Sequence, residues 1–333
     1  FFTVGGAEAN ENAIKIARMV TGRHKVLAAY RSYHGGTYGA STLSGESRRW
    51  PAEPGIPGVV HFFGPYPYRS PFRVPPEQEA EAALAHLEEV LHYEGPHTVA
   101  AIFLEPIVGS NGLIVPPDGY LQGVRQLCDR FGILLVLDEV MTGFGRTGRW
   151  FAAEHWNVIP DMITFAKGVT AGYVPLGGVL VHERLARHFD QQVLWAGLTY
   201  SGHPLACAAG VATMEVYEQE GLVERAARLE PVVRHRLEEL ARRHPIVGDV
   251  RGKGLFFGVE LVRDRATREA WAAWNSPQTG PMNRLLSALL ERGVYLFGRW
   301  NVLFIAPPLT ITEEELDFGI EALGEVLARA EQE

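Results

Sequence analysis

Apolar residues in the first two-thirds of the chain alternate between short continuous runs and runs with helical spacing. Short apolar runs bounded by turn residues are typical of buried strands, and apolar positions three and four residues apart are typical of helices. Their alternation predicts an α/β fold in which βα units surround a mostly parallel sheet. The predicted elements are a helix over 8–20 and strands over 26–30, 59–63, 99–104, 134–138, 162–166 and 178–181.

The pattern changes near Gly221, which interrupts a helical pattern over 203–220 before it resumes over 222–243. We therefore expect a large domain over residues 1–220 and a smaller C-terminal domain over 221–333. Strands are predicted in the second part at 254–261, 294–297 and 302–306, and helices at 281–292 and from residue 312 onward. This mixture predicts an α+β domain.

Composition and charge narrow the class of protein. The 333 residues are 47% hydrophobic and carry a formal net charge of -8, with no basic stripe, which argues against nucleic-acid binding and favours small-molecule partners. No apolar run has the length of a membrane span, and no leader opens the chain. Cys128 and Cys207 have no CxxC partner, so buried free thiols and a cytoplasmic location are expected.

Two predicted strands end in residues with complementary chemistry. Asp138 ends the strand over 134–138, and Lys167 follows the strand over 162–166. The carboxyl ends of strands line the ligand crevice of an open α/β sheet, so both side chains can face one site. A lysine amine forms a Schiff base with an aldehyde cofactor, and a carboxylate keeps a pyridine nitrogen protonated. The pairing indicates pyridoxal phosphate.

Weaker signals lie near the start of the chain. Gly5, Gly6 and Ala7 precede an acidic helix start, where backbone amides can bind a phosphate, although a Gly-Gly pair before a helix is also an ordinary turn. Tyr33 and His34 follow the next strand. The Tyr33 ring could stack on a planar cofactor, or it could be an ordinary half-buried tyrosine.

Together these motifs resemble the class III aminotransferases over essentially the whole chain. The resemblance rests on Val4 to Glu11, Tyr33 to Gly35, Glu105-Pro106, Asp138 to Gly148, Ala166 to Gly168 and Thr199 to Pro204. It implies a fold-type I pyridoxal-phosphate enzyme with a mostly parallel seven-stranded sheet flanked by helices. It also implies a homodimer with shared active sites, or a tetramer. The run Gly64 to Arg69 is most similar to the taurine:pyruvate and related ω-aminotransferases.

The resemblance assigns catalytic roles to two residues. Lys167 would form the internal aldimine and then carry a proton between substrate and cofactor. Asp138 would pair with the pyridinium nitrogen. An apolar strand leading into Lys167 also favours a desolvated amine with a lowered pKa.

Further cofactor contacts are implied by the same motifs. Tyr33 and Val140 would cover the two faces of the ring, with His34, Glu105 and Met141 nearby. Met141 replaces a glutamine that many relatives have, and a thioether is a poor hydrogen-bond donor. The phosphate would be bound by Gly5, Gly6 and Ala7, where Ala7 replaces a serine or threonine of many relatives, and by Thr199 of the neighbouring subunit.

The substrate is less readable. The arginine and glutamate that handle differently charged substrates in ornithine and 4-aminobutyrate enzymes are replaced by Phe304 and Ser110, which disfavours those activities. Arg299 could grip a keto-acid carboxylate, or it could be a solvated loop residue. Arg146 is expected to form an internal ion pair.

The predicted function is a ping-pong transamination from an ω-amino donor such as taurine, β-alanine or a diamine to a keto acid, pyruvate being preferred. The alternatives are an aminomutase, decarboxylase or lyase of the same fold, and an inactive chain. The sequence starts at Phe1 without methionine, and the family's preceding segment, which completes part of the small domain and the substrate pocket, is expected to be missing. No motif for a metal or a nucleotide is found.

Overall fold

The computed structural model describes residues 1–277 and 279–332, which divide into two compact units. The first unit contains residues 1–109, 116–144 and 150–220. The second contains the remainder of the chain from residue 221, together with two short segments, 110–115 and 145–149. These segments join the second unit through specific contacts, such as Arg251, whose guanidinium Nε donates to the carbonyl oxygen of Leu113 at 2.8 Å.

A seven-stranded sheet forms the centre of the first unit, in the order β1-β7-β6-β5-β4-β2-β3. Its strands are β1 (Phe2–Thr3), β2 (Lys25–Ala29), β3 (Val59–Phe62), β4 (Val99–Leu104), β5 (Leu134–Asp138), β6 (Met162–Phe165) and β7 (Gly177–Val181). Strands β2 to β6 are parallel, and β7 runs antiparallel to its neighbours β6 and β1. The predicted mostly parallel sheet of seven strands is confirmed.

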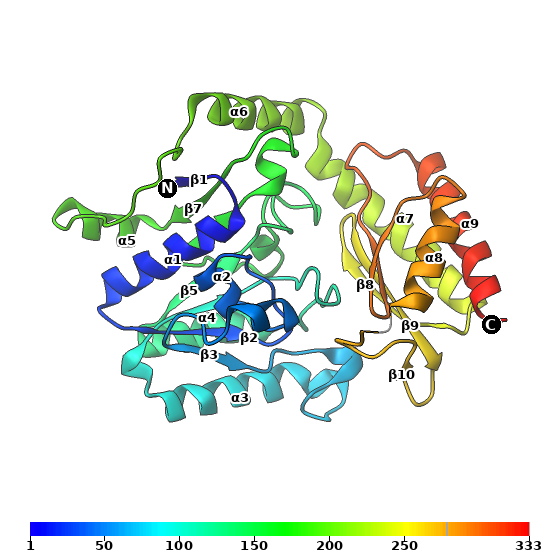
Figure 1. The fold of residues 1–333 in the computed structure, drawn as a ribbon, viewed down its shortest axis with the longest axis horizontal. Coiled ribbons are helices and arrows are strands. Elements are labelled where there is room, and N and C mark those ends of the chain that lie inside the picture. Colours follow the sequence, from blue (N-terminus) through cyan, green and yellow to red (C-terminus); the bar gives the residue numbers. More distant parts are fainter. Residues whose placement is uncertain (278, 333) are drawn as a thin grey trace. The chain divides into compact units, whose positions relative to one another are not determined.

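Helix α1 (Gly6–Thr21) crosses this sheet and packs on one of its faces (Figure 1). Its buried residues include Ala13, Ile14 and Ala17, which belong to the same core cluster as Val136 on β5. The helix ends at Gly22, whose φ of 65° and N–H bond to the carbonyl of Arg18 form a left-handed cap. The other helices of the unit are α2 (Tyr38–Leu43), α3 (Glu79–Glu94), α4 (Tyr120–Phe131), α5 (Glu183–Ala186) and α6 (Pro204–Gln219).

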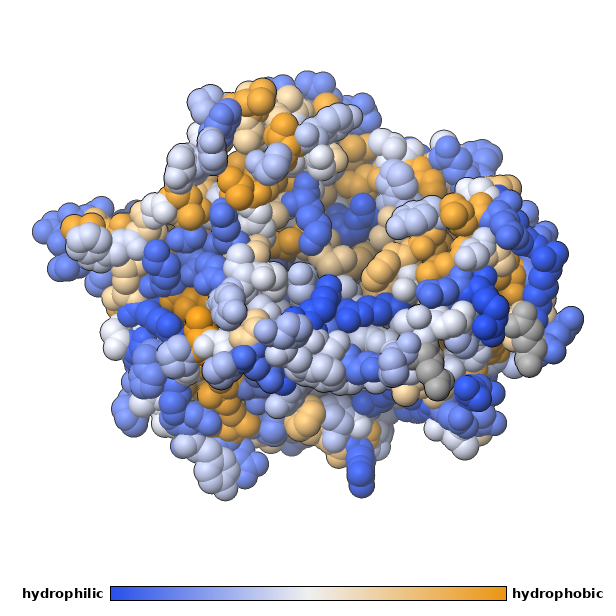
Figure 2. Space-filling model, viewed as in Figure 1, coloured by the Kyte–Doolittle hydropathy of each residue, from blue (hydrophilic) through white to orange (hydrophobic). Residues whose placement is uncertain are grey.

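Helix α6 leaves apolar surface uncovered in the single chain. Leu205 is 66% exposed and Val211 is 52% exposed, and Figure 2 shows apolar side chains gathered over this helix. A soluble monomer seldom presents such a patch without a partner for it.

Over its described residues, the second unit combines antiparallel strands with three helices, which is an α+β composition. Its strands are β8 (Val247–Lys253), β9 (Phe256–Asp264), β10 (Glu269–Ala270), β11 (Phe297–Arg299) and β12 (Val302–Ile305), and its helices are α7 (Leu222–Arg243), α8 (Gly280–Leu290) and α9 (Glu313–Ala330). The strands pair in the order β10-β9-β12-β11, with β8 on β9. Strand β8 was not predicted, because its sequence is rich in glycine and charge and its pairing with β9 decides its conformation.

Both cysteines are free thiols, as predicted, but only Cys128 on α4 is buried, whereas Cys207 on α6 is half-buried. Over the described residues, no helix combines the length and the apolar character that crossing a membrane requires.

Candidate active site

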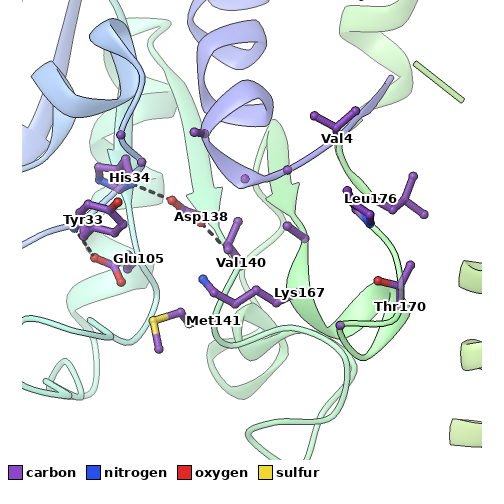
Figure 3. A pocket seen from close by; sticks show the side chains of 18 of the residues that line it. Val4, Tyr33, His34, Glu105, Asp138, Val140, Met141, Lys167, Thr170 and Leu176 are labelled. Atoms are coloured by element: carbon purple, nitrogen blue, oxygen red, sulfur yellow. Dashed lines mark hydrogen bonds and ion pairs between the residues drawn. The ribbon is translucent and has the colours of Figure 1, made fainter. Parts of the chain in front are cut away.

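A cavity of about 540 Å³ in the first unit lies at the carboxyl ends of its parallel strands (Figure 3). This is the edge at which open α/β sheets bind ligands. Ten of the residues predicted for the site line it: Gly5, Gly6, Ala7, Tyr33, His34, Glu105, Asp138, Val140, Met141 and Lys167. Segments that lie far apart in the sequence therefore converge on one cavity.

Asp138 is held in a fixed orientation at the end of β5. Its side chain is buried, and its Oδ2 accepts hydrogen bonds from Asn10 Nδ2 and His34 Nδ1, both at 2.8 Å. Its Oδ1 accepts the backbone N–H of Val140 at 3.1 Å. Burial acts to lower the pKa of His34, but the bond to Asp138 and the negative charge of Asp138 outweigh it and raise that pKa.

Asn10 was not predicted as a site residue. Its side chain is fully buried on α1, its Nδ2 also donates to the carbonyl oxygen of His34 at 2.7 Å, and its Oδ1 accepts Thr164 Oγ1 at 2.9 Å. It thus joins α1, β6 and the His34 loop to Asp138. The signal in the sequence was a polar residue at helical spacing from Ala13, Ile14 and Ala17, on an otherwise apolar face.

Lys167 projects into the cavity from the start of the short 3₁₀ helix Lys167–Thr170 that follows β6 (Figure 3). Its backbone is left-handed, with φ of 44°, a conformation that costs a non-glycine residue about 1–2 kcal/mol and that clusters at functional sites. Although the side chain is reached by solvent, the cavity walls partly desolvate its ammonium. This desolvation and the charge of Arg48 lower the pKa of Lys167, while Asp138 and Glu105 oppose the change.

Glu105 ties together two loops beside the cavity. Its Oε1 accepts the backbone N–H of Tyr33 at 2.9 Å, and its Oε2 accepts that of Gly109 at 2.8 Å. Burial raises the pKa of the Glu105 carboxyl to about 7, against the effects of the charge of His34 and of these two bonds. The carboxyl thus fixes the backbone of the residue whose ring lines the cavity.

The first turn of α1 presents backbone N–H groups with little side-chain bulk around them. A Cβ on Gly6 would lie 2.8 Å from Val140 Cγ2, and a Cβ on Gly35, where φ is 139°, would lie 2.5 Å from the Cβ of Ala7. Larger residues at these two glycines would therefore collide with Val140 and Ala7 and fill the space in front of the α1 amides. Amides at a helix N-terminus without intrahelical partners form a ready site for an anion such as phosphate.

The ring of Tyr33 contacts the guanidinium of Arg48, and the sequence did not predict this contact. The guanidinium carbon of Arg48 lies 3.5 Å from the centroid of the Tyr33 ring. Arg48 Nε is bonded to the carboxylate of Glu46, whose side chain is fully buried. No periodic pattern marks Arg48, because it lies in the short 3₁₀ helix Ser47–Ala52 that follows α2, so only folding reveals the contact.

Thr199, Arg299 and Arg146 were also singled out from the sequence, and none of them is among the described residues that line the cavity. Thr199 is exposed in a turn before α6 and is not among the described residues that line the cavity. Arg299 belongs to the second unit, at the end of β11, with its guanidinium carbon 4.0 Å from the ring centroid of Trp300. Arg146, also in the second unit, donates to the carbonyl oxygens of Leu255 and Pro307 at 3.0 and 2.6 Å. These two partners are backbone groups, and the ion pair expected for Arg146 stays a prediction.

Comparison with known proteins identifies the family to which this arrangement belongs. Residues 1–327 match the model of the family described as aminotransferase class-III. The chain is a class-III aminotransferase. Pyridoxal phosphate is the cofactor of this family, which confirms the cofactor predicted from the sequence.

A solved structure of taurine:2-oxoglutarate aminotransferase from Bifidobacterium kashiwanohense, in complex with PLP and glutamate, is similar to this class-III aminotransferase, with a TM-score of 0.97 and 48% identity. The match covers 100% of this chain and 75% of that one. The fold-type I prediction is thereby confirmed.

Two curated relatives extend the comparison. A leucine/methionine racemase from Thermococcus litoralis is 39% identical, over 99% of this chain and 73% of its own length. A taurine–pyruvate aminotransferase from Bilophila wadsworthia is 35% identical, over 100% of this chain and 76% of its own length. Relatives of similar identity thus carry names for two different reactions.

Proposed function

We propose that this class-III aminotransferase moves an amino group from an ω-amino donor, such as taurine, β-alanine or a diamine, to pyruvate, with Lys167 and Asp138 as its catalytic residues. The observation that carries the proposal is the convergence of the Lys167 amine, with its lowered pKa, and the anchored Asp138 carboxylate in one cavity.

The cavity fits pyridoxal phosphate. Its volume of about 540 Å³ lies in the range of small-molecule sites, and it offers an amine, a buried carboxylate and a helix N-terminus. The phosphate would be held by the amides at Gly5, Gly6 and Ala7, and the ring between Tyr33 and Val140. His34, Glu105 and Met141 would surround the ring.

When bound, the cofactor supplies an electron sink for the pair left behind when a bond at the substrate carbon breaks. Asp138 would keep a positive charge on the pyridine nitrogen, since Asn10 and His34 hold its Oδ2 in place. Lys167 Nζ would remove the proton from the carbon that bears the donor's amino group and return it. A lowered pKa increases the fraction of neutral amine available for this work.

Pyruvate is proposed as acceptor because Phe304 stands at the position where the ornithine and 4-aminobutyrate enzymes are expected to have an arginine. That arginine would bind the second carboxylate of an acceptor with two acid groups, and a buried phenylalanine would not. Phe304 is 5% exposed, and its ring centroid lies 5.0 Å from that of Phe297. Arg299 on the neighbouring strand would bind the single carboxylate of pyruvate. The name of the taurine:2-oxoglutarate relative makes 2-oxoglutarate the second acceptor to test.

We further propose that the protein is a homodimer, or a dimer of dimers, with active sites shared between subunits. The apolar surface of α6 would be buried against a second copy, and Thr199, which is exposed in the single chain, would reach the phosphate of the partner's site.

A product assay tests the proposed reaction. The cofactor-loaded protein is incubated with taurine, β-alanine or putrescine together with pyruvate or 2-oxoglutarate, and newly formed alanine or glutamate is measured. The proposal predicts alanine formation that depends on both donor and pyruvate. Glutamate in place of alanine would overturn the choice of acceptor. Interconversion of L- and D-leucine without consumption of a keto acid would instead support the racemase reaction named in one relative.

A further inference from the structure

The backbone at Lys167 has a strained conformation that its surroundings must maintain. Lys167 has a φ of 44°, and Ala171, which follows the short 3₁₀ helix Lys167–Thr170, has a φ of 48°. Left-handed backbone at residues other than glycine costs free energy and persists only where the structure around it determines it. The contacts of this short helix therefore also set the direction in which the Lys167 side chain leaves the backbone.

One of these contacts comes from helix α6. The hydroxyl of Tyr217 donates to the carbonyl oxygen of Gly168, the residue directly after Lys167, at 3.0 Å. The same carbonyl oxygen accepts the N–H of Ala171 at 3.2 Å, which is a bond within the segment itself. Tyr217 thus adds a donor from a distant part of the sequence to the carbonyl group next to the lysine.

The Tyr217 side chain is itself held in place. It is 7% exposed, and its ring meets the ring of Trp150 edge to face, with the centroids 5.9 Å apart. The carbonyl oxygen of Trp150 accepts the N–H of Phe144 at 2.6 Å. Phe144 in turn packs directly against Gly168, since a Cβ on Gly168 would lie 2.8 Å from the Cβ of Phe144. Packing and hydrogen bonding therefore fix the Gly168 backbone together.

We propose that Tyr217 is a positioning residue of the enzyme, whose hydroxyl bond to Gly168 holds the backbone of Lys167 and so directs the amine of this lysine into the cavity. This inference rests on the proposed function and adds to it a residue that is not among the described residues lining the cavity. A change at Tyr217 then acts through Lys167. Misplacement of a reacting group by about 1 Å can slow a reaction by about 100-fold.

Replacement Tyr217→Phe tests the hydroxyl alone, because the ring that packs on Trp150 is kept. The donor half-reaction with β-alanine is followed without keto acid, from the absorbance of the bound cofactor. We expect the maximal rate to fall by about 3- to 10-fold, the equivalent of one neutral hydrogen bond, and the half-saturating concentration of donor to stay the same. This split indicates a loss of reacting geometry rather than of donor binding.

Tyr120→Phe is the matched control. Tyr120 on α4 is 3% exposed, and its hydroxyl has no hydrogen-bond partner among the described residues. The replacement deletes the same atom from another buried tyrosine, but no bond is lost with it. The maximal rate of Tyr120→Phe is therefore expected to equal that of the wild type.

A titration of the cofactor-free protein gives a readout that does not depend on turnover. The sequence contains four lysines, Lys15, Lys25, Lys167 and Lys253, so isotope-labelled reductive methylation gives few NMR signals. The signal of Lys167 is the one that Lys167→Arg lacks. Desolvation lowers the pKa of this amine, so an amine released toward solvent should titrate at a higher pH. We expect this rise in Tyr217→Phe, only for Lys167, and no change in Tyr120→Phe.

Three outcomes would overturn the role of Tyr217. They are a maximal rate in Tyr217→Phe equal to that of the wild type, an unchanged pKa of Lys167 in this variant, and equal losses of rate in the two tyrosine variants. Failure of the wild type to react with any ω-amino donor would instead contradict the proposed function, and the lysine titration would still test whether Tyr217 positions Lys167.

Discussion

Asp138 receives hydrogen bonds from two segments that only folding brings to it, α1 and the His34 loop, and a local one from the end of its own strand. A buried carboxylate that loses a donor retains the cost of its desolvation, about 1–3 kcal/mol or more. Asn10 is therefore a positioning residue for Asp138.

Replacement of Asn10 by alanine is expected to weaken the retention of pyridoxal phosphate by about tenfold, because Asp138 loses one of its two Oδ2 donors. The measurement is the Kd of the cofactor by fluorescence titration. Asn12→Ala is the control on the same helix, since Asn12 Nδ2 donates to the carbonyl oxygen of Glu8 and not to Asp138. Equal cofactor affinity in the two variants would contradict the role of Asn10.

Lys167 and Asp138 could be predicted from the sequence because each directly follows or ends an apolar strand, so local pattern and chemistry coincide. Asn10 and Arg48 could not, because their contacts depend on long-range pairing. His34 Nδ1 on Asp138 and the Arg48 guanidinium on Tyr33 are consequences of how loops pack, which periodicity does not encode.

Glu139 shows how one buried acid organises the segment after β5. Its side chain is fully buried, and its two carboxyl oxygens accept the backbone N–H groups of Ala152 and Ala153, at 2.9 and 2.8 Å, and the hydroxyl of Thr142. These bonds cap the short helix Ala152–Trp156. Burial raises the pKa of Glu139 to about 7 in spite of them.

A pH dependence of stability follows from this pKa. Between about pH 4.5 and 7 the folded state keeps the Glu139 proton that the unfolded chain has lost, so the stabilisation present at low pH decreases as pH rises through this window. One such group contributes a slope of up to about -1.4 kcal/mol per pH unit to the free energy of unfolding. Denaturant unfolding of wild type and Glu139→Gln at pH 5, 6 and 7 should show a smaller decrease in the variant, which keeps the contribution of Glu105, whose pKa is also raised to about 7. Parallel curves would exclude the raised pKa.

The elements that could be predicted from the sequence are those marked by a local pattern, such as a continuous apolar run. The elements whose bounds depend on pairing with a distant strand could not be placed as well. The strands of the first unit are short and continuous apolar runs, and all six predicted strands begin and end within one residue of the observed bounds, β4 and β5 without any shift. Strand β11 was displaced, with residues 294–297 predicted and Phe297–Arg299 observed, because its pairing with β12 fixes its register. The two-residue strand β1 carries no periodic signal at all.

Helix α6 has the composition of a buried helix but the exposure of a surface helix, as seen from Leu205, Val211 and Val216, which are all exposed. Burial of such surface against a second copy would remove apolar area from water at about 25 cal/mol per Å². This is the physical basis for the proposed dimer.

Val211→Glu is expected to shift the protein from dimer to monomer in sedimentation velocity, because a charge would be buried in the proposed contact. Tyr93→Glu is the control, since Tyr93 is 83% exposed at the end of α3 rather than on α6. Dimers of unchanged stability in Val211→Glu would place the contact elsewhere.

The central claim is that Lys167 and Asp138 move an amino group through the bound cofactor. The most direct measurement is the visible spectrum of the cofactor-loaded protein after addition of β-alanine or taurine without keto acid, and then of pyruvate. The account predicts that the donor converts the band of the bound cofactor to that of pyridoxamine phosphate, that pyruvate restores it, and that Lys167→Ala shows neither change. A band that forms normally but survives every ω-amino donor would contradict amino-group transfer, and conversion that persists in Lys167→Ala would contradict the role of this lysine.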